Sequence, residues 1–156
     1  MNEKLIRVFI SVSVPKEIVL IKKMLKSTIN TKNTKISWVR DGKMHLTLRY
    51  IGNTTEESID SINNAIHNVI ADTSVINLSI SETGSFAKRN IANTLWLGIK
   101  GEIDKLNQLV QNINNKLEPL GYPIEKREFL PHITLARINP SQKRKPDISN
   151  FLNTTF

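Results

Sequence analysis

Two short motifs carry the residues of this sequence best suited to acid–base chemistry. They are HLTL, which begins at His45, and HITL, which begins at His132, in a chain with only three histidines. Alternate side chains of a β-strand point to the same face. Each motif would therefore show an imidazole beside the hydroxyl of Thr47 or Thr134 and bury the residue between them. One such motif is weak evidence, but two in one chain favour a shared site.

Two histidines and two threonines suit in-line displacement at phosphorus. Imidazole titrates near pH 6.5, so at neutral pH one histidine can take a proton from water while another gives a proton to the departing oxygen. The threonine hydroxyls would hydrogen-bond the non-bridging oxygens, and a guanidinium would stabilise the developing charge. Strict alternation favours Arg49, which shares the face of His45, over Arg137, unless the second strand bulges or ends near residue 136.

Other chemistries find little support in the sequence. There is no cysteine, and neither His-x-His nor His-Glu-x-x-His occurs, so we expect no metal and no cofactor. His67 lies on the polar side of a helical pattern and is predicted to be a solvated surface residue. Trp38 and Trp96 are predicted to be core residues. Tyr50, Phe86 and Phe129 are predicted to pack in the core, with stacking on a nucleobase as the alternative.

Composition predicts one domain of a protein that is neither disulfide-bonded nor membrane-spanning. The chain has 156 residues and a formal charge of +8, which favours an anionic partner such as nucleic acid or a phosphorylated metabolite. The first five residues are too polar for a signal sequence, and no apolar run approaches the roughly 18 residues of a membrane span. We therefore expect a cytoplasmic monomer.

Hydrophobic periodicity predicts an α+β fold. Alternating patterns indicate strands over 5–13, 36–39, 44–51, 76–80, 94–99 and 132–138, and a further strand that begins at Ile148. Helical spacing indicates helices over 16–29, 54–70 and 102–117, the second with a capping box from Thr54 to Glu57. Asp41-Gly42 predicts a hairpin, and 82–93 reads as a basic loop. The motif strands take comparable places in two halves, so we infer a pseudo-symmetric pair of lobes.

These blocks resemble the two-histidine (2H) phosphoesterases, in the branch of RNA 2′,3′-cyclic phosphodiesterases and 2′-5′ RNA ligases. The resemblance covers nearly the whole chain and rests on five stretches. They are 7–15 (RVFISVSVP), 38–52 (WVRDGKMHLTLRYIG), 83–86 (TGSF), 95–98 (LWLG) and 129–137 (FLPHITLAR).

The resemblance implies a bilobal fold in which two antiparallel sheets line a central cleft and the helices pack outside. It also implies metal-free hydrolysis of a 2′,3′-cyclic phosphate to a 2′-phosphate. His45 would be the acid at the leaving 3′-oxygen and His132 the base for water. By the same resemblance Arg137 binds the phosphate together with the threonines, and Tyr50 contacts the nucleoside. Relatives continue through a last hairpin, so the resemblance predicts one domain, residues 1–156, that lacks this hairpin or has a rebuilt C-terminal edge.

Three alternatives remain open at this point. The same residues could serve a 2′-5′ phosphodiesterase or 2′-5′ RNA ligase. A non-catalytic nucleotide- or RNA-binding module would keep the cleft but would not need two proton-transfer groups. A purely structural domain would lose only stability on replacement of His45. The substrate, an RNA end or a small cyclic nucleotide, is not specified by the sequence.

Overall fold

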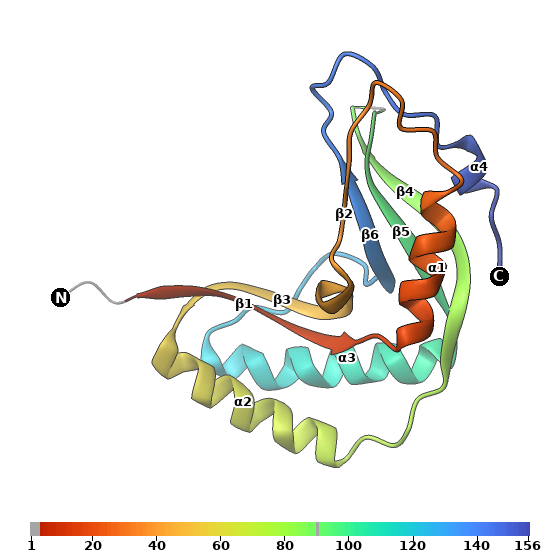
Figure 1. Cartoon of the computed structure of the whole chain (residues 1–156). Helices are drawn as coiled ribbons and strands as arrows, with labels where there is room; N and C mark the ends of the chain where they lie inside the picture. Colours follow the sequence, from red (N-terminus) through yellow and green to blue (C-terminus); the bar gives the residue numbers. More distant parts are fainter. Residues whose placement is uncertain (1–3, 90) are drawn as a thin grey trace. The chain divides into compact units, whose positions relative to one another are not determined.

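The computed structural model describes residues 4–89 and 91–156 (Figure 1). Short 3₁₀ turns lie at Asp41–Lys43 and Glu118–Leu120. The helices and strands, in chain order, are β1 (Leu5–Ser13), α1 (Lys16–Lys26), β2 (Ile36–Trp38), β3 (His45–Thr55), α2 (Glu56–Ala71), β4 (Leu78–Lys88), β5 (Ile91–Gly101), α3 (Ile103–Leu117), β6 (His132–Ile138) and α4 (Ser149–Leu152).

The chain divides into two compact units, and both motif histidines fall in the same one. The first unit comprises 1–11, 47–78 and 101–130, and the second comprises 12–46, 79–100 and 131–156. The strands are hydrogen-bonded in the order β1-β3-β6-β5-β4, with β2 also paired to β6. The predicted α+β class is confirmed. The strands predicted to form two sheets are connected in one hydrogen-bonded path, because β3 has neighbours on both sides.

The first unit consists of strands β1 and β3 with helices α2 and α3. The side chain of Thr55 caps α2 by accepting a hydrogen bond from the Ser58 backbone N–H at 3.2 Å. The predicted cap, Thr54, lies one residue too early, and its hydroxyl is hydrogen-bonded instead to the Tyr122 hydroxyl at 2.6 Å. The predicted apolar stripe of α3 is confirmed, with Leu106, Val110, Ile113 and Leu117 buried.

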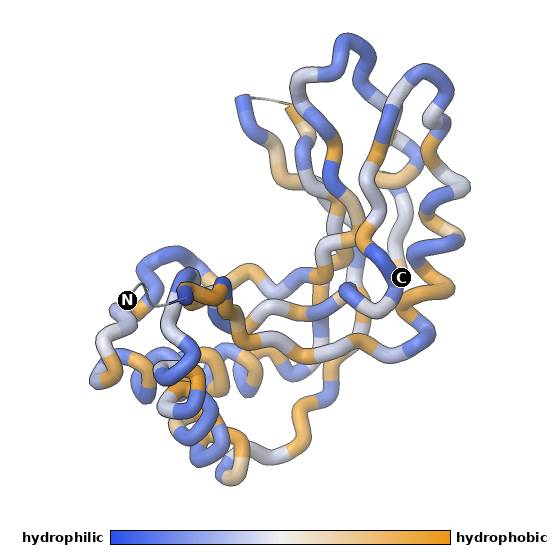
Figure 2. Tube along the Cα trace, turned by 60° about the vertical axis from the view of Figure 1, so that its left-hand side comes forward, coloured by the Kyte–Doolittle hydropathy of each residue, from blue (hydrophilic) through white to orange (hydrophobic). Residues whose placement is uncertain are grey.

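The second unit is built around β6, which has antiparallel partners on both edges. Ile36 lies opposite Ile138 in the β2–β6 pair, and Leu97 lies opposite Ile133 in the β5–β6 pair. Figure 1 shows α1 running along this sheet. Apolar and polar residues alternate along much of the trace in Figure 2, as expected for strands with one buried face. Ile133 and Leu135 are 2% and 0% exposed, which marks the buried face of β6.

Besides the helix cap, three local predictions were wrong. Asp41-Gly42 forms a 3₁₀ turn rather than a hairpin, since β2 and β3 both pair with β6. Residues 82–88 continue strand β4 instead of forming a loop. The segment that starts at Ile148 turns into α4, where Phe151 is fully buried and its carbonyl accepts a hydrogen bond from the Thr83 hydroxyl at 2.5 Å.

Candidate active site

The two motifs lie on neighbouring antiparallel strands. In the β3–β6 pair Leu46 lies opposite Ile133, and both side chains are buried. This register puts His45 opposite Thr134 on the other face of the strands, and His132 shares that face because it lies two residues from Thr134. Diagonal neighbours of this kind lie about 7–8 Å apart, with their Cβ atoms somewhat closer. The pairing therefore brings both imidazoles and one threonine hydroxyl to one surface.

A β-bulge adds Arg137 to this surface. Along β5 the partners are Trp96 opposite Thr134 but Leu95 opposite Ala136, so Leu135 is an extra residue. The bulge reverses the alternation of β6 beyond that point. Arg137 lies opposite Thr94, which shares the β5 face of Trp96, and the Arg137 side chain is exposed while Ile138 is buried. Strict alternation had placed Arg137 on the opposite face, and that argument was wrong.

His45 is held by the turn that precedes it. Its Nδ1 lies 2.7 Å from the backbone oxygen of Lys43. Because a carbonyl can only accept, Nδ1 donates the hydrogen in this bond. The turn is tied to α1 by Lys22, whose buried Nζ donates to the Val39 oxygen at 2.6 Å and to Asp41 Oδ1 at 2.5 Å. This arrangement fixes the position of His45 on its strand.

His132 is held by an aromatic cluster. Its ring lies 5.0 Å from the ring of Phe86, with an angle of 89° between the planes, and 6.2 Å from that of Trp96. The centroids of Phe86 and Trp96 are 5.4 Å apart. Edge-to-face contacts at these separations are favourable by about 0.5–1.5 kcal/mol beyond the area they bury. The indole of Trp96, predicted to belong to the core, therefore lies on the face of the candidate site.

Arg49, the reserve candidate for binding phosphate, has a structural role. It is 8% exposed, and its guanidinium donates to Asn114 Oδ1 at 2.9 Å, to the Pro123 oxygen at 2.7 Å and to the Tyr50 oxygen at 3.1 Å. Leu48 and Arg49 are both buried, so β3 also departs from alternation. These bonds connect β3 to α3 and to the segment that follows α3. The guanidinium of Arg49 is therefore engaged within the first unit.

Thr47 and Tyr50 belong to the first unit. Tyr50 is exposed, and its hydroxyl accepts a hydrogen bond from Arg7 Nε at 2.7 Å. The Arg7 guanidinium carbon lies 5.6 Å from the centre of the Tyr50 ring. Tyr50 is therefore not part of the core of its unit. The contributions of Thr47 to phosphate binding and of Tyr50 to nucleoside binding stay predictions.

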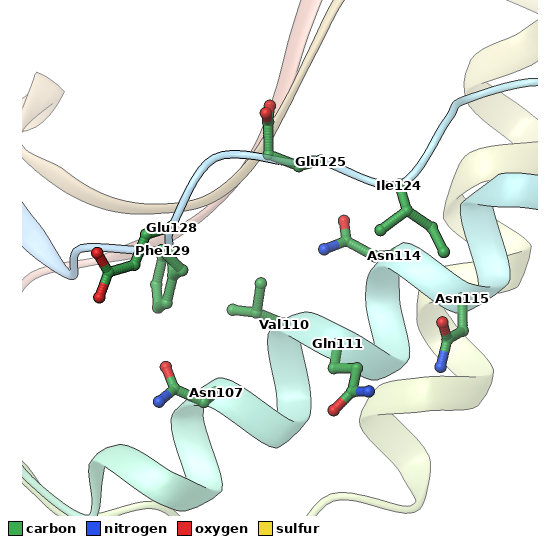
Figure 3. A pocket seen from close by; sticks show the side chains of 9 residues that line it. All are labelled: Asn107, Val110, Gln111, Asn114, Asn115, Ile124, Glu125, Glu128 and Phe129. Carbon is green, nitrogen blue, oxygen red and sulfur yellow. The ribbon is translucent and has the colours of Figure 1, made fainter.

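The first unit also has a polar hollow of about 360 Å³ between α3 and the segment that follows it (Figure 3). Hydrogen bonds from Arg127 lower the pKa of Glu125 in its wall, so this carboxylate is charged at neutral pH. Phe129, for which the sequence left stacking on a nucleobase open, lines the hollow, whereas the motif histidines and threonines, both candidate arginines and Tyr50 do not. Its lining residues are Asn107, Val110, Gln111, Asn114, Asn115, Ile124, Glu125, Glu128 and Phe129.

Within residues 4–89 and 91–156, no group of three or more His, Cys, Asp or Glu side chains is arranged to hold a metal ion. Of the helices described, none combines the length and the apolar composition needed to cross a membrane.

Comparison with known proteins identifies the family. The sequence model of the 2′-5′ RNA ligase superfamily matches residues 16–152. The chain belongs to the 2′-5′ RNA ligase superfamily. An RNA 2′,3′-cyclic phosphodiesterase of Geobacillus stearothermophilus is 30% identical over 101 residues, which are 65% of this chain and 32% of that protein. A protein of the same name from Methanocaldococcus jannaschii is 26% identical over 155 residues, 96% of this chain and 83% of the relative.

A solved structure confirms the fold of this superfamily member. E. coli LigT complexed with 3′-AMP superposes with a TM-score of 0.71 and 20% identity, over 92% of this chain and 79% of that one. The chain spans about a third of the Geobacillus relative and most of the Methanocaldococcus relative.

Sequence reasoning missed the residues that orient His132 in this superfamily member. Gly98 lies opposite His132, and a Cβ there would come within 2.6 Å of the Ser81 hydroxyl and 3.3 Å of Trp96 Cζ3. A Cβ on Gly84 would lie 2.2 Å from two indole carbons of Trp96. The two glycines thus leave the space in which the indole lies. Gly98, which lies within the predicted strand 94–99, was the available signal, since such glycines often mark a close approach. Gly84 lay in a segment predicted to be a loop and gave no such signal.

Gly84→Ala is therefore expected to disturb His132 without touching it. The new methyl group must displace the Trp96 indole, and with it the ring contacts of His132. We expect the imidazole NMR signals of His132 to shift and those of His67 to stay. The turnover number should fall by about 10- to 100-fold, as for a catalytic group misplaced by an ångström. Gly42→Ala is the matched control, because a Cβ there meets nothing within 4 Å. An unchanged His132 spectrum in Gly84→Ala would contradict this role of the indole.

Proposed function

We propose that this protein hydrolyses the 2′,3′-cyclic phosphate at the 3′ end of RNA to a 2′-phosphate. The observation that carries the proposal is the pairing of Leu46 with Ile133, which brings His45 and His132 to one face of adjacent strands. The names of the two relatives support this substrate, and so does the 3′-AMP complex of LigT. Binding alone does not need two proton-transfer groups.

The proposed reaction is a single in-line displacement. His132 takes a proton from water as its oxygen attacks phosphorus. The bond between phosphorus and the 3′-oxygen breaks on the opposite side, and His45 Nε2 protonates that leaving oxygen. The product carries a 2′-phosphate and a 3′-hydroxyl, and the histidines regain their starting protonation by exchange with solvent. No nucleophilic side chain and no metal ion takes part.

The remaining proposed roles are the binding of the phosphate oxygens and of the nucleoside. Thr134 lies opposite His45, so its hydroxyl is placed to donate to a non-bridging oxygen. Arg137, brought to the same face by the bulge, adds a guanidinium that stabilises charge as the pentacoordinate state forms. We assign Thr47 to the second non-bridging oxygen and Tyr50 to the nucleoside.

A second candidate function is hydrolysis or formation of 2′-5′ linkages, which the name of the superfamily favours. Both reactions pass through the same in-line geometry, so the residues do not separate them. The decisive experiment measures turnover of two oligoribonucleotides of equal length in the presence of EDTA. One ends in a 2′,3′-cyclic phosphate, and the other contains a single 2′-5′ linkage. We expect turnover of the cyclic end to exceed that of the 2′-5′ linkage by at least about tenfold. The reverse preference would replace the proposal with the second candidate.

A further inference from the structure

Positive charge is concentrated at one end of the second unit. Three segments meet there: the loop before β2, the β4–β5 hairpin, and the end of β6 with the loop beyond it (Figure 1). The two loops are tied together by Gln142, whose side chain accepts from the Lys35 N–H at 3.0 Å and donates to the Lys35 oxygen at 3.1 Å. Thr94 of β5 lies opposite Arg137 of β6, so the β4–β5 hairpin lies at the same end of the sheet as the end of β6.

Apart from Arg137, which belongs to the candidate active site, seven cationic side chains and one carboxylate lie in the sequence ranges 30–37, 86–94 and 139–147. Their sum is +6, against +8 for the whole chain. The carboxylate is Asp147, whose pKa is lowered by hydrogen bonds from the Ser149 side chain and backbone, so its charge is already counted. All seven cations are exposed: Lys32, Lys35, Lys88, Arg89, Lys143, Arg144 and Lys145. A surface with charges of one sign attracts molecules of the opposite charge, which here means polyanions.

Strand β6 connects this basic end to the candidate active site. It runs from His132 to Ile138, a length of about 20 Å at the usual rise per residue. Arg137 lies near the far end and on the face of His132 and Thr134. A mononucleotide held by the two histidines is too small to reach the loops beyond Ile138. A single-stranded RNA whose cyclic end is held there can lay further phosphates along the same direction.

We propose that the basic end of the second unit binds the phosphodiester backbone of single-stranded RNA, several nucleotides from the cyclic terminus. This inference rests on the proposed function and extends the recognised part of the RNA from the cyclic end to the nucleotides that precede it. Lysine and arginine contacts with phosphates are independent of sequence and release counterions, so binding weakens steeply with salt.

The test compares two triple variants that lose the same charge. Lys88, Lys143 and Arg144 become glutamine in the first variant. It spares Lys145, whose Nζ donates to the Gln142 oxygen at 2.6 Å, and Arg89, which has a positive φ of 55°. The matched control replaces Lys16, Lys23 and Lys116, which are exposed on α1 and α3. Each protein is given a nucleoside 2′,3′-cyclic phosphate and a 12-nucleotide RNA with a cyclic end, over a range of salt concentrations.

The first triple variant should raise KM for the 12-nucleotide RNA about tenfold at low salt and reduce the salt slope of log binding by about 2, since each single-strand contact contributes about 0.7. Turnover of the mononucleotide should stay within twofold, and the control should match the wild type. Equal KM values for wild type and first variant on the 12-nucleotide RNA would overturn the inference and leave the proposed function standing. Absence of turnover of both substrates by the wild type would overturn the proposed function. Fluorescence anisotropy would then measure the affinity of the wild type and the first variant for the same RNA. Equal affinities would overturn the inference too.

Discussion

Replacing either His45 or His132 with alanine should lower turnover of a 2′,3′-cyclic phosphate by about 10²- to 10⁴-fold. His45→Ala removes the group that protonates the leaving 3′-oxygen, and His132→Ala removes the group that accepts a proton from water. Both side chains are half-buried on the open face of their strands, so the fold should survive both changes. The measurement is kcat/KM for each variant in EDTA, with circular dichroism and thermal unfolding as the test of folding.

His67→Ala is the matched control for these variants. His67 is exposed on α2, as the sequence predicted, and its loss should leave turnover within twofold. The double variant should be little worse than either single variant, because two groups that act in one step are not additive. A folded His132→Ala protein with near wild-type turnover would contradict the paired acid–base mechanism.

Arg137→Gln should lower turnover by about 10²-fold at unchanged stability, whereas Arg49→Met should lower stability. The exposed Arg137 shares the face of His132, so its loss removes charge stabilisation from the transition state. Loss of the buried Arg49 leaves the Asn114 and Pro123 oxygens without their donor, which costs about 2–3 kcal/mol in the free energy of unfolding. Urea denaturation and kcat measured side by side separate the two effects.

The opposite pattern would reverse the assignment of the phosphate arginine. If Arg49→Met kept its stability but lost turnover, the guanidinium of Arg49 would have to leave its bonds to α3 and the following segment to bind phosphate. Arg137→Lys offers a further check, because lysine keeps the charge but not the bidentate geometry. We expect it to recover part of the activity that Arg137→Gln loses.

The two arginines show what sequence periodicity can and cannot predict. The bounds of β6, from His132 to Ile138, agree with the prediction because Ile133 and Leu135 alternate with polar residues and Ile138 ends the apolar segment. Alternation alone nevertheless chose Arg49, since no local signal marks Leu135 as a bulged residue. The resemblance to the 2H phosphoesterases favoured Arg137 instead as the phosphate-binding arginine. The bulge depends on how β6 fits against β5, and that fit is a long-range property of the fold.

Long-range pairing also explains the other misses. Asp41-Gly42 has the composition of a hairpin turn, but the neighbour of β2 is β6, which comes much later in the chain. The segment 82–88 was predicted to be a loop because it contains Gly84 and polar residues. In the structure this glycine makes room for Trp96, and the indole in turn contacts His132. These residues support the site through contacts between strands that a local pattern does not describe.

The most direct test of the central claim is the position of the phosphate and the origin of its new oxygen. A short RNA with a 2′,3′-cyclic phosphate end is converted in ¹⁸O-labelled water with EDTA, and the product is examined by ³¹P NMR and mass spectrometry. We expect a 2′-phosphate that carries one oxygen from the labelled water. A 3′-phosphate product would contradict the assignment of the 3′-oxygen as the leaving group. A cyclic end left intact by the folded protein would contradict the proposed activity itself.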